Sequence, residues 1–119
     1  MNGKMASISP VWGAAAGDVV GSVYEHRPNK SGDFPLLDEA SRFTDDTVLT
    51  AAVAHAVTHG EDYARALRRF GRAYPDAGYG ASFHAWLGNE RIGAYNSFGN
   101  GAAMRVSAVG AAFASREEV

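Results

Sequence analysis

Two adjacent carboxylates between two hydroxyls are the residues of this chain best suited to chemistry. Thr44, Asp45, Asp46 and Thr47 follow one another in the sequence. Carboxylate and hydroxyl oxygens that converge at one point are ligands that suit a hard cation such as Mg²⁺ or Mn²⁺. These four groups do not complete a coordination shell, so a cation bound here would need further ligands from elsewhere.

The same four residues also have a purely structural interpretation. Thr44 is a good helix N-cap, because its hydroxyl can accept a hydrogen bond from a backbone N–H of the first turn. Asp45 and Asp46 then fall in that first turn, where the helix dipole favours negative charge. An apolar run with helical periodicity follows as far as His59, and Gly60 suits the position after the last turn. The residues alone leave both interpretations open.

A glycine-rich turn is the second stretch with chemical potential. It lies within residues 96–105 and reads Asn-Ser-Phe-Gly-Asn-Gly-Ala-Ala-Met-Arg. Freely oriented backbone N–H groups before a helix can bind an anion such as phosphate. The stretch lacks the Gly-Lys-Ser/Thr ending of a P-loop, and no predicted strand precedes it. Taken alone, the stretch favours an ordinary turn between helices over an anion site, and Phe98 could stack on a base or anchor the turn.

The elements that must position these residues are helices. The apolar periodicity predicts an all-α chain with helices over residues 10–24, 45–59, 62–74, 82–87 and 102–113. Residues 1–8 and 26–43 are expected to be irregular, the second because of its prolines, glycine and mixed charge. Ser115 and Glu118 have the spacing of a capping box, which predicts the start of another helix.

A stripe of glycines marks one face of the first predicted helix. Gly13, Gly17 and Gly21 recur every four residues, and Asp18 lies beside them. A glycine in a helix interior costs up to about 1 kcal/mol, so three on one face need a reason. The stripe predicts either a close crossing with another helix or the close approach of a ligand to this backbone.

Two further patterns are interpreted structurally. His55 and His59 have the spacing of a metal pair but no third ligand near them in sequence, so His59 is expected to complement the dipole of its helix. Arginines lie off the apolar stripe of the third predicted helix, and we expect them to form a solvated basic face rather than a phosphate site. These arginines are Arg65, Arg68, Arg69 and Arg72.

Composition narrows the classes of function. The chain has 119 residues, enough for one small domain, with a net charge of -2 that gives no reason to expect nucleic acid or a membrane as partner. It has no cysteine, which excludes disulfides and thiolate metal sites. No apolar run approaches the ~20 residues of a membrane span, and the first residues do not resemble a signal peptide. We therefore expect a cytoplasmic protein.

Three stretches together resemble the ADP-ribosylglycohydrolase family, of the kind that includes dinitrogenase-reductase-activating glycohydrolase. They are Gly13–Glu25, Phe43–Thr47 and Ser97–Arg105. Their order matches the family, and the region that they delimit covers nearly the whole chain. The resemblance implies an all-α fold with a two-magnesium centre in a cleft. It also implies hydrolysis of the glycosidic bond that joins ADP-ribose to a modified protein side chain, or of related ADP-ribose conjugates.

The resemblance assigns roles to particular residues. Thr44, Asp45 and Asp46 match metal ligands for Mg²⁺, with Mn²⁺ as an alternative. Glu25 matches a glutamate beside the metals and the scissile ribose, so Glu25 and Asp45 are the candidate catalytic residues. Asp18 lies within a matching motif without a clear role. The residues that match the ADP-ribose-binding loop are Ser97, Phe98, Gly99, Asn100 and Gly101, with Met104 shortly after them.

The chain also departs from the family pattern. Family domains are longer, and their second half supplies an Asp-x-Asp-Thr motif that completes the metal centre; this sequence contains no such motif. We therefore expect residues 1–119 to be the N-terminal half of the domain, completed by a C-terminal segment or by a second copy. The alternative is a non-catalytic module that binds ADP-ribose or serves in assembly.

Overall fold

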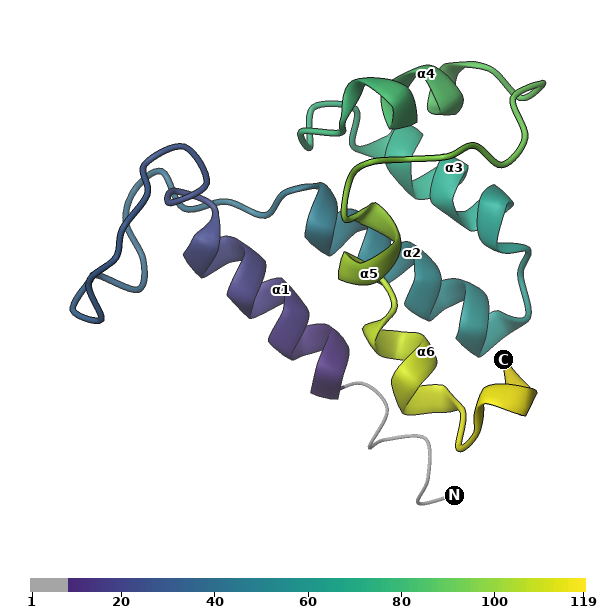
Figure 1. Ribbon diagram of the computed structural model, residues 1–119, viewed down its shortest axis with the longest axis horizontal. Helices are drawn as coiled ribbons and strands as arrows, with labels where there is room; N and C mark the ends of the chain where they lie inside the picture. Colours follow the sequence, from purple (N-terminus) through teal and green to yellow (C-terminus); the bar gives the residue numbers. More distant parts are fainter. Residues whose placement is uncertain (1–8) are drawn as a thin grey trace.

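The computed structural model describes residues 9–119, and this part of the chain is helical with no β-strand (Figure 1). The all-α prediction is confirmed, whereas the expected irregular start at residues 1–8 lies outside the described residues. None of the described helices is both long and apolar enough to span a membrane. The helices are α1 (Ser9–Gly21), α2 (Asp45–His59), α3 (Tyr63–Ala73), α4 (Ala81–Gly88), α5 (Gly101–Met104) and α6 (Ser107–Ala112), followed by a 3₁₀ turn, η1 (Arg116–Glu118).

Helix α2 is the centre of the fold. It contacts α1, α3, α5 and α6, and Figure 1 shows it between α1 and α3. Its predicted bounds are confirmed: the Thr44 hydroxyl accepts from the Asp46 N–H at 3.3 Å, and Gly60 closes the helix with a φ of 65°. The buried apolar core consists of Val48, Leu49, Ala52, Val53 and Ala56 of α2 with Ala66, Trp86, Leu87 and Ala108.

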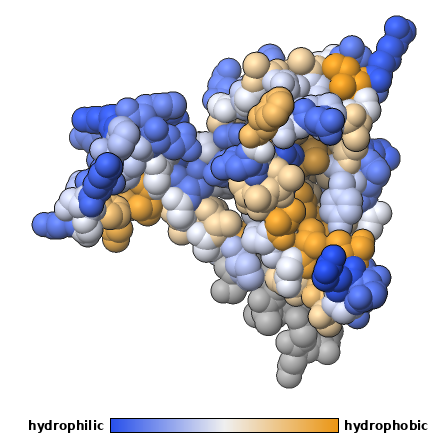
Figure 2. Space-filling view, viewed as in Figure 1, coloured by the Kyte–Doolittle hydropathy of each residue, from blue (hydrophilic) through white to orange (hydrophobic). Residues whose placement is uncertain are grey.

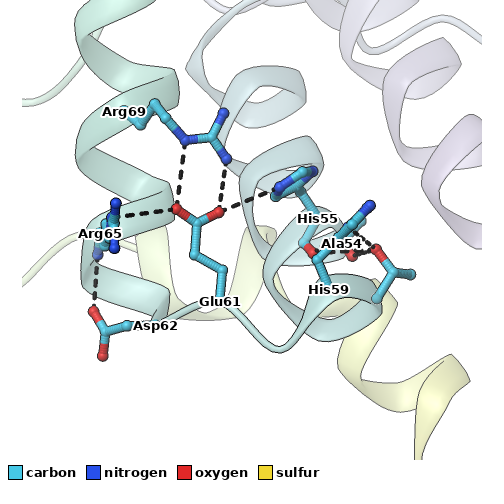
Figure 3. A network of polar contacts seen from close by, with 8 residues as sticks. Ala54, His55, His59, Glu61, Asp62, Arg65 and Arg69 are labelled. Atoms are coloured by element: carbon cyan, nitrogen blue, oxygen red, sulfur yellow. Dashed lines mark hydrogen bonds and ion pairs between the residues drawn. The ribbon is translucent and has the colours of Figure 1, made fainter.

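A charged network closes the connection from α2 to α3 (Figure 3). Glu61 Oε2 lies 2.7 Å from Arg69 Nη2 and 3.3 Å from His55 Nε2. The His55 and His59 rings are stacked, with centroids 4.0 Å apart. Asp62 caps α3 by accepting from the Arg65 N–H at 2.9 Å. The histidines therefore belong to a structural network at this turn.

The expectation of a solvated arginine face on α3 is wrong for Arg68, which is only partly exposed, whereas Arg72 is exposed although it also bonds a carbonyl. Arg68 Nη2 donates to the carbonyl of Ile92 at 2.9 Å, and Arg72 Nε donates to the carbonyl of Leu87 at 2.9 Å. The Arg68 guanidinium also lies over the Trp86 ring at 3.8 Å. These side chains satisfy carbonyls of α4 and of the segment after it, which helical hydrogen bonds leave unpaired.

Helix α1 ends three residues earlier than predicted. Its last residue is Gly21, and the Tyr24 N–H donates to the Gly21 carbonyl in a turn. The Ser22 hydroxyl donates to the Val19 carbonyl at 2.8 Å and accepts from the Arg42 N–H at 3.1 Å. Serine competes in this way with backbone hydrogen bonding and favours helix ends. Glu25 consequently lies beyond the helix.

The helix predicted over residues 102–113 is divided into α5 and α6. Arg105 Nε donates to the Gly101 carbonyl, and the Thr50 hydroxyl donates to the Met104 carbonyl. These two carbonyls thus accept hydrogen bonds from side chains. In a continuous helix each would accept from the backbone N–H four residues further on. The capping box does not form: Ser115 makes no cap hydrogen bond with its side chain, and Glu118 Oε2 accepts from the Ala114 N–H at 2.9 Å, one residue before Ser115. A single 3₁₀ turn follows Ser115.

Residues 26–43 are irregular, as expected, and form an arm that extends from the helices (Figure 1). The Tyr24 hydroxyl donates to the Pro35 carbonyl at 2.8 Å, and its ring meets Phe34 edge to face. The arm begins at the end of α1 and returns at the start of α2. The arm therefore brings Asp18 and Glu25, near the end of α1, close to Asp45 and Asp46, at the start of α2.

Candidate metal centre

The Asp18 carboxylate connects α1 to the first turn of α2. Its Oδ2 accepts from the backbone N–H of Thr44 at 2.7 Å and of Thr47 at 3.2 Å. The hydroxyls of both threonines donate to the same carboxylate at 2.6 Å. A negative charge at a helix N-terminus is favourable, and here it is supplied by another helix. Asp18 therefore fixes the backbone on which Asp45 and Asp46 stand.

Three carboxylates converge beside this cap. Asp18, Glu25 and Asp46 each offer one oxygen, and these oxygens lie within 4.8 Å of one another. Burial raises the pKa of the Asp46 carboxyl, and the charges of Asp18 and Glu25 raise it further. Like charges this close destabilise one another, and a divalent cation with oxygen ligands would offset their repulsion. The donor set therefore fits Mg²⁺ or Mn²⁺.

A cleft of about 330 Å³ opens at these carboxylates. A Cβ atom placed on Gly17 or Gly21 would meet no other atom within 4 Å. At these glycines the described residues therefore do not make the close helix crossing that was one of the two predicted alternatives. Because glycine has no side chain, the surface of α1 next to the three carboxylates stays open. The lining residues are Ala14, Gly17, Asp18, Gly21, Glu25, Asp46, Thr50 and Met104.

Asp45 does not belong to the group of three carboxylates. Its backbone N–H donates to the Ala77 carbonyl at 2.8 Å, and its Oδ1 lies 3.9 Å from where a Cβ on Gly78 would be. Burial and then the charge of Asp46 raise the pKa of Asp45 to about 6. Burial, with a contribution from Asp45, raises the pKa of Tyr79 to about 12. The Asp45 carboxylate thus lies towards the connection between α3 and α4.

The glycine-rich stretch reaches the cleft through Met104 alone among its predicted ligand-binding residues. Phe98 is fully exposed, and the Ser97 hydroxyl accepts from the Gly99 N–H at 3.1 Å. The Asn100 carbonyl accepts from the N–H groups of residues 103 and 104. Ser97, Phe98, Gly99, Asn100 and Gly101 therefore form a turn next to the cleft rather than part of its lining.

The sequence named Thr47 among the candidate oxygen ligands of a cation, but it did not single out Thr50 as a site residue. Thr47 donates to Asp18, and Thr50 is buried, lines the cleft and donates to the Met104 carbonyl at 3.3 Å. A signal for Thr50 was present, since it follows Asp46 by four residues and so shares its helix face. No comparable sequence signal indicates the contact with Met104, which depends on how the helices pack.

Comparisons with known proteins agree with the resemblance. The family model described as ADP-ribosylglycohydrolase matches residues 9–119. Similar curated proteins are ADP-ribosylhydrolase ARH3 of Bos taurus, 30% identical over 90% of this chain, and that of Xenopus tropicalis, 32% identical over 85%. The aligned parts cover 39% and 37% of these relatives, so the chain spans about two fifths of their length. No solved structure matches the chain.

Proposed function

Because the chain belongs to the ADP-ribosylglycohydrolase family, we propose that it supplies the N-terminal half of a site that hydrolyses ADP-ribose conjugates. The substrate would be an ADP-ribosylated protein or a related ADP-ribose compound, in keeping with the ADP-ribosylhydrolase relatives. The observation that carries this proposal is the convergence of Asp18, Glu25 and Asp46 at one cleft.

The metal ligands proposed from this chain are Thr44, Asp45 and Asp46, with Glu25 beside them. Hard oxygen donors suit Mg²⁺, and Mn²⁺ is the alternative. When bound, two such cations would orient ribose hydroxyls, activate a water molecule and stabilise charge on the leaving oxygen. The Asp18 carboxylate keeps Thr44 in place, since it accepts both the backbone N–H and the hydroxyl of that residue.

Glu25 and Asp45 are the proposed catalytic residues. Glycosidic cleavage passes through an oxocarbenium-like state and needs a carboxyl group that can donate or accept a proton. Glu25 is exposed at the cleft, so its carboxylate can meet a substrate. Asp45 is half-buried on the first turn of α2, next to the group of three carboxylates.

ADP-ribose binding is proposed for the turn Ser97, Phe98, Gly99, Asn100 and Gly101, together with Met104. The exposed Phe98 ring can stack on an adenine base, because aromatic rings stack on the faces of bases. Backbone N–H groups of the turn can donate to a diphosphate. The same turn supports the second candidate function, a non-catalytic ADP-ribose module, because it lies outside the carboxylate group.

A complementary polypeptide is the proposed partner of α1. A helix that is apolar on all sides is normally buried. Asp18 is the only charged residue of α1, yet none of the residues from Pro10 to Gly21 is buried, and Trp12 is 71% exposed. We propose that a C-terminal segment of the family domain covers this helix, with a second copy as the competing outcome. A cytoplasmic location is part of the same proposal.

Calorimetric titration with ADP-ribose tests the function. The chain is titrated once with Mg²⁺ and once with EDTA, alone and after mixing with the C-terminal part of a longer family member. The proposal expects binding that needs Mg²⁺, and release of free ADP-ribose from an ADP-ribosylated protein by the mixture. Binding that is equal with EDTA would favour the non-catalytic module, and absence of binding by chain and mixture alike would contradict both.

A pair of variants assigns the metal site. Asp46→Asn removes one charge from the carboxylate group and is expected to weaken Mg²⁺ binding at least about tenfold, because hard cations bind through charged oxygens. Asp76→Asn is the matched control, since Asp76 is exposed on the α3–α4 connection and outside the group. Equal Mg²⁺ affinity in the two variants would show that the cation binds elsewhere.

A further inference from the structure

Arg105 folds back onto the last residue of the proposed ADP-ribose loop. It follows α5, it is not exposed, and its Nε donates to the Gly101 carbonyl. Its Nη2 occupies the space into which a Cβ atom on residue 101 would project. A side chain at residue 101 would therefore displace the guanidinium.

The other side of the guanidinium is packed against α4. The Arg105 Cζ lies 5.2 Å from the centre of the Phe83 ring, which in turn lies 5.4 Å from the Tyr79 ring. Burial lowers the pKa of Arg105, whereas Tyr95 and Asp45 act in the opposite direction. The side chain therefore lies between the glycine-rich turn and the surroundings of Asp45, against an aromatic ring that fixes its position.

We propose that Arg105 is a positioning residue that holds the Gly101 end of the ADP-ribose loop in a fixed orientation beside the acidic site. This inference rests on the proposed function. Because the peptide group is planar and trans, fixing the direction of the Gly101 carbonyl also fixes the opposite direction of the Ala102 N–H. The contact with Gly101 thus orders a loop that otherwise has few internal contacts, and the order reduces the entropy lost when a ligand binds.

Three variants separate this role from ordinary packing. Arg105→Met keeps most of the side-chain length and removes the donor, whereas Arg105→Lys keeps one charged donor. Arg72→Met is the matched control, because Arg72 Nε also donates to a carbonyl, that of Leu87 in α4. Gly101→Ala is a second route to the same defect, since the added methyl group displaces the guanidinium without removing it.

The first readout needs no ligand. The N–H groups of Ala103 and Met104 donate to the Asn100 carbonyl at 2.9 and 3.1 Å, so their hydrogen exchange reports the order of the turn. Arg105→Met and Gly101→Ala are expected to speed this exchange about tenfold, measured relative to core amides of α2, because a charge-assisted hydrogen bond is lost. Arg72→Met is expected to leave the ratio unchanged.

The second readout is affinity for ADP-ribose in the presence of Mg²⁺. Arg105→Met is expected to raise the Kd about tenfold without changing the affinity for Mg²⁺, and Arg105→Lys to restore most of it. An exchange ratio in Arg105→Met and Gly101→Ala no different from that of Arg72→Met would overturn the inference. A wild-type chain that binds no ADP-ribose, alone or mixed, would contradict the proposed function, while the exchange ratio would still decide the role of Arg105.

Discussion

A single carboxylate, that of Asp18, determines how the candidate site is held. It accepts four hydrogen bonds, two from backbone N–H groups and two from hydroxyls, all on Thr44 and Thr47. Hydrogen bonds to charged groups contribute more than neutral ones. The carboxylate is therefore already engaged by the protein, and we expect it to serve the fold at least as much as it serves a cation.

Replacement of Asp18 by asparagine should lower the free energy of unfolding by about 2–4 kcal/mol, because the charge is lost and the amide N–H groups face at least one of the four donors. Urea denaturation measures the change. Asp62→Asn is the matched control, since Asp62 caps its own helix α3 and asparagine caps equally well. An equal loss in the two variants would mean that Asp18 is only an ordinary cap.

Sequence reasoning succeeded for residues whose role is local. Thr44 and Gly60 cap α2 as predicted, because capping depends on neighbours in sequence. The sequence did not indicate that Asp45 and Asp46 have different surroundings. In the structure Asp46 lines the cleft, whereas Asp45 lies near Gly78. Successive helix residues point about 100° apart, so Asp45 and Asp46 leave the helix in different directions, and packing decides which of the two faces the cleft.

At the scale of elements, alanine substitutions on the glycine face of α1 can distinguish an effect on stability from an effect on ligand binding. Gly17 lines the cleft and Gly13 does not, while both have open space where a Cβ would lie. Alanine at either position should stabilise the chain by about 0.5–1 kcal/mol through helix propensity. Gly17→Ala alone should weaken binding of Mg²⁺ or ADP-ribose, because its methyl group projects into the cleft. Thermal denaturation and calorimetry measure the two effects, and equal binding by both variants would contradict a ligand at this face.

The connection between α2 and α3 predicts a pH dependence. The hydrogen bond with Arg69 lowers the pKa of Glu61 below its ordinary value of 4.5. A depressed pKa contributes stability above the unfolded value, and this contribution is lost as the pH falls through the folded value. Glu61→Gln should therefore destabilise the chain near pH 7 and approach the wild type as the pH falls well below 4.5. Urea titrations at both pH values test it.

Glu90→Gln is the control for this prediction. Glu90 pairs with Arg72 at 3.0 Å, but its side chain is 73% exposed. Exposed pairs contribute little, so this variant should follow the wild type at both pH values. If Glu61→Gln behaved in the same way, the network in Figure 3 would be a surface contact without influence on stability.

Helices were predictable where apolar periodicity and caps agree, as in α2 and α3. The failures lie where side chains take over backbone hydrogen bonds from a distance. Ser22 shortens α1, and Arg105 with Thr50 divides the last predicted helix. Such contacts depend on tertiary packing, and neither periodicity nor propensity records them.

At the scale of the whole molecule, the chain is more open than its length requires. Its radius of gyration is 15.4 Å, against about 13.5 Å expected for a compact domain of this size. Apolar surface is visible on the arm and on the helical body in Figure 2. Leu36 and Leu37 on the arm are 65% and 64% exposed, and α1 has Trp12 on its surface. Exposed apolar surface of this kind usually marks an interaction site.

The two tryptophans provide a direct test of whether α1 is covered. Trp12 is 71% exposed and Trp86 is 7% exposed, so the difference between the emission spectra of the wild type and Trp12→Phe reports Trp12. Mixing with the C-terminal segment of a longer family member should shift this difference spectrum to shorter wavelength, because the indole leaves water.

Trp12→Glu should weaken the association and leave Mg²⁺ binding to the acidic group intact, since Trp12 does not line the cleft. A shift that depends on the concentration of the chain alone would instead identify a second copy as the cover. An exposed Trp12 in a mixture that hydrolyses its substrate would show that α1 needs no cover for function.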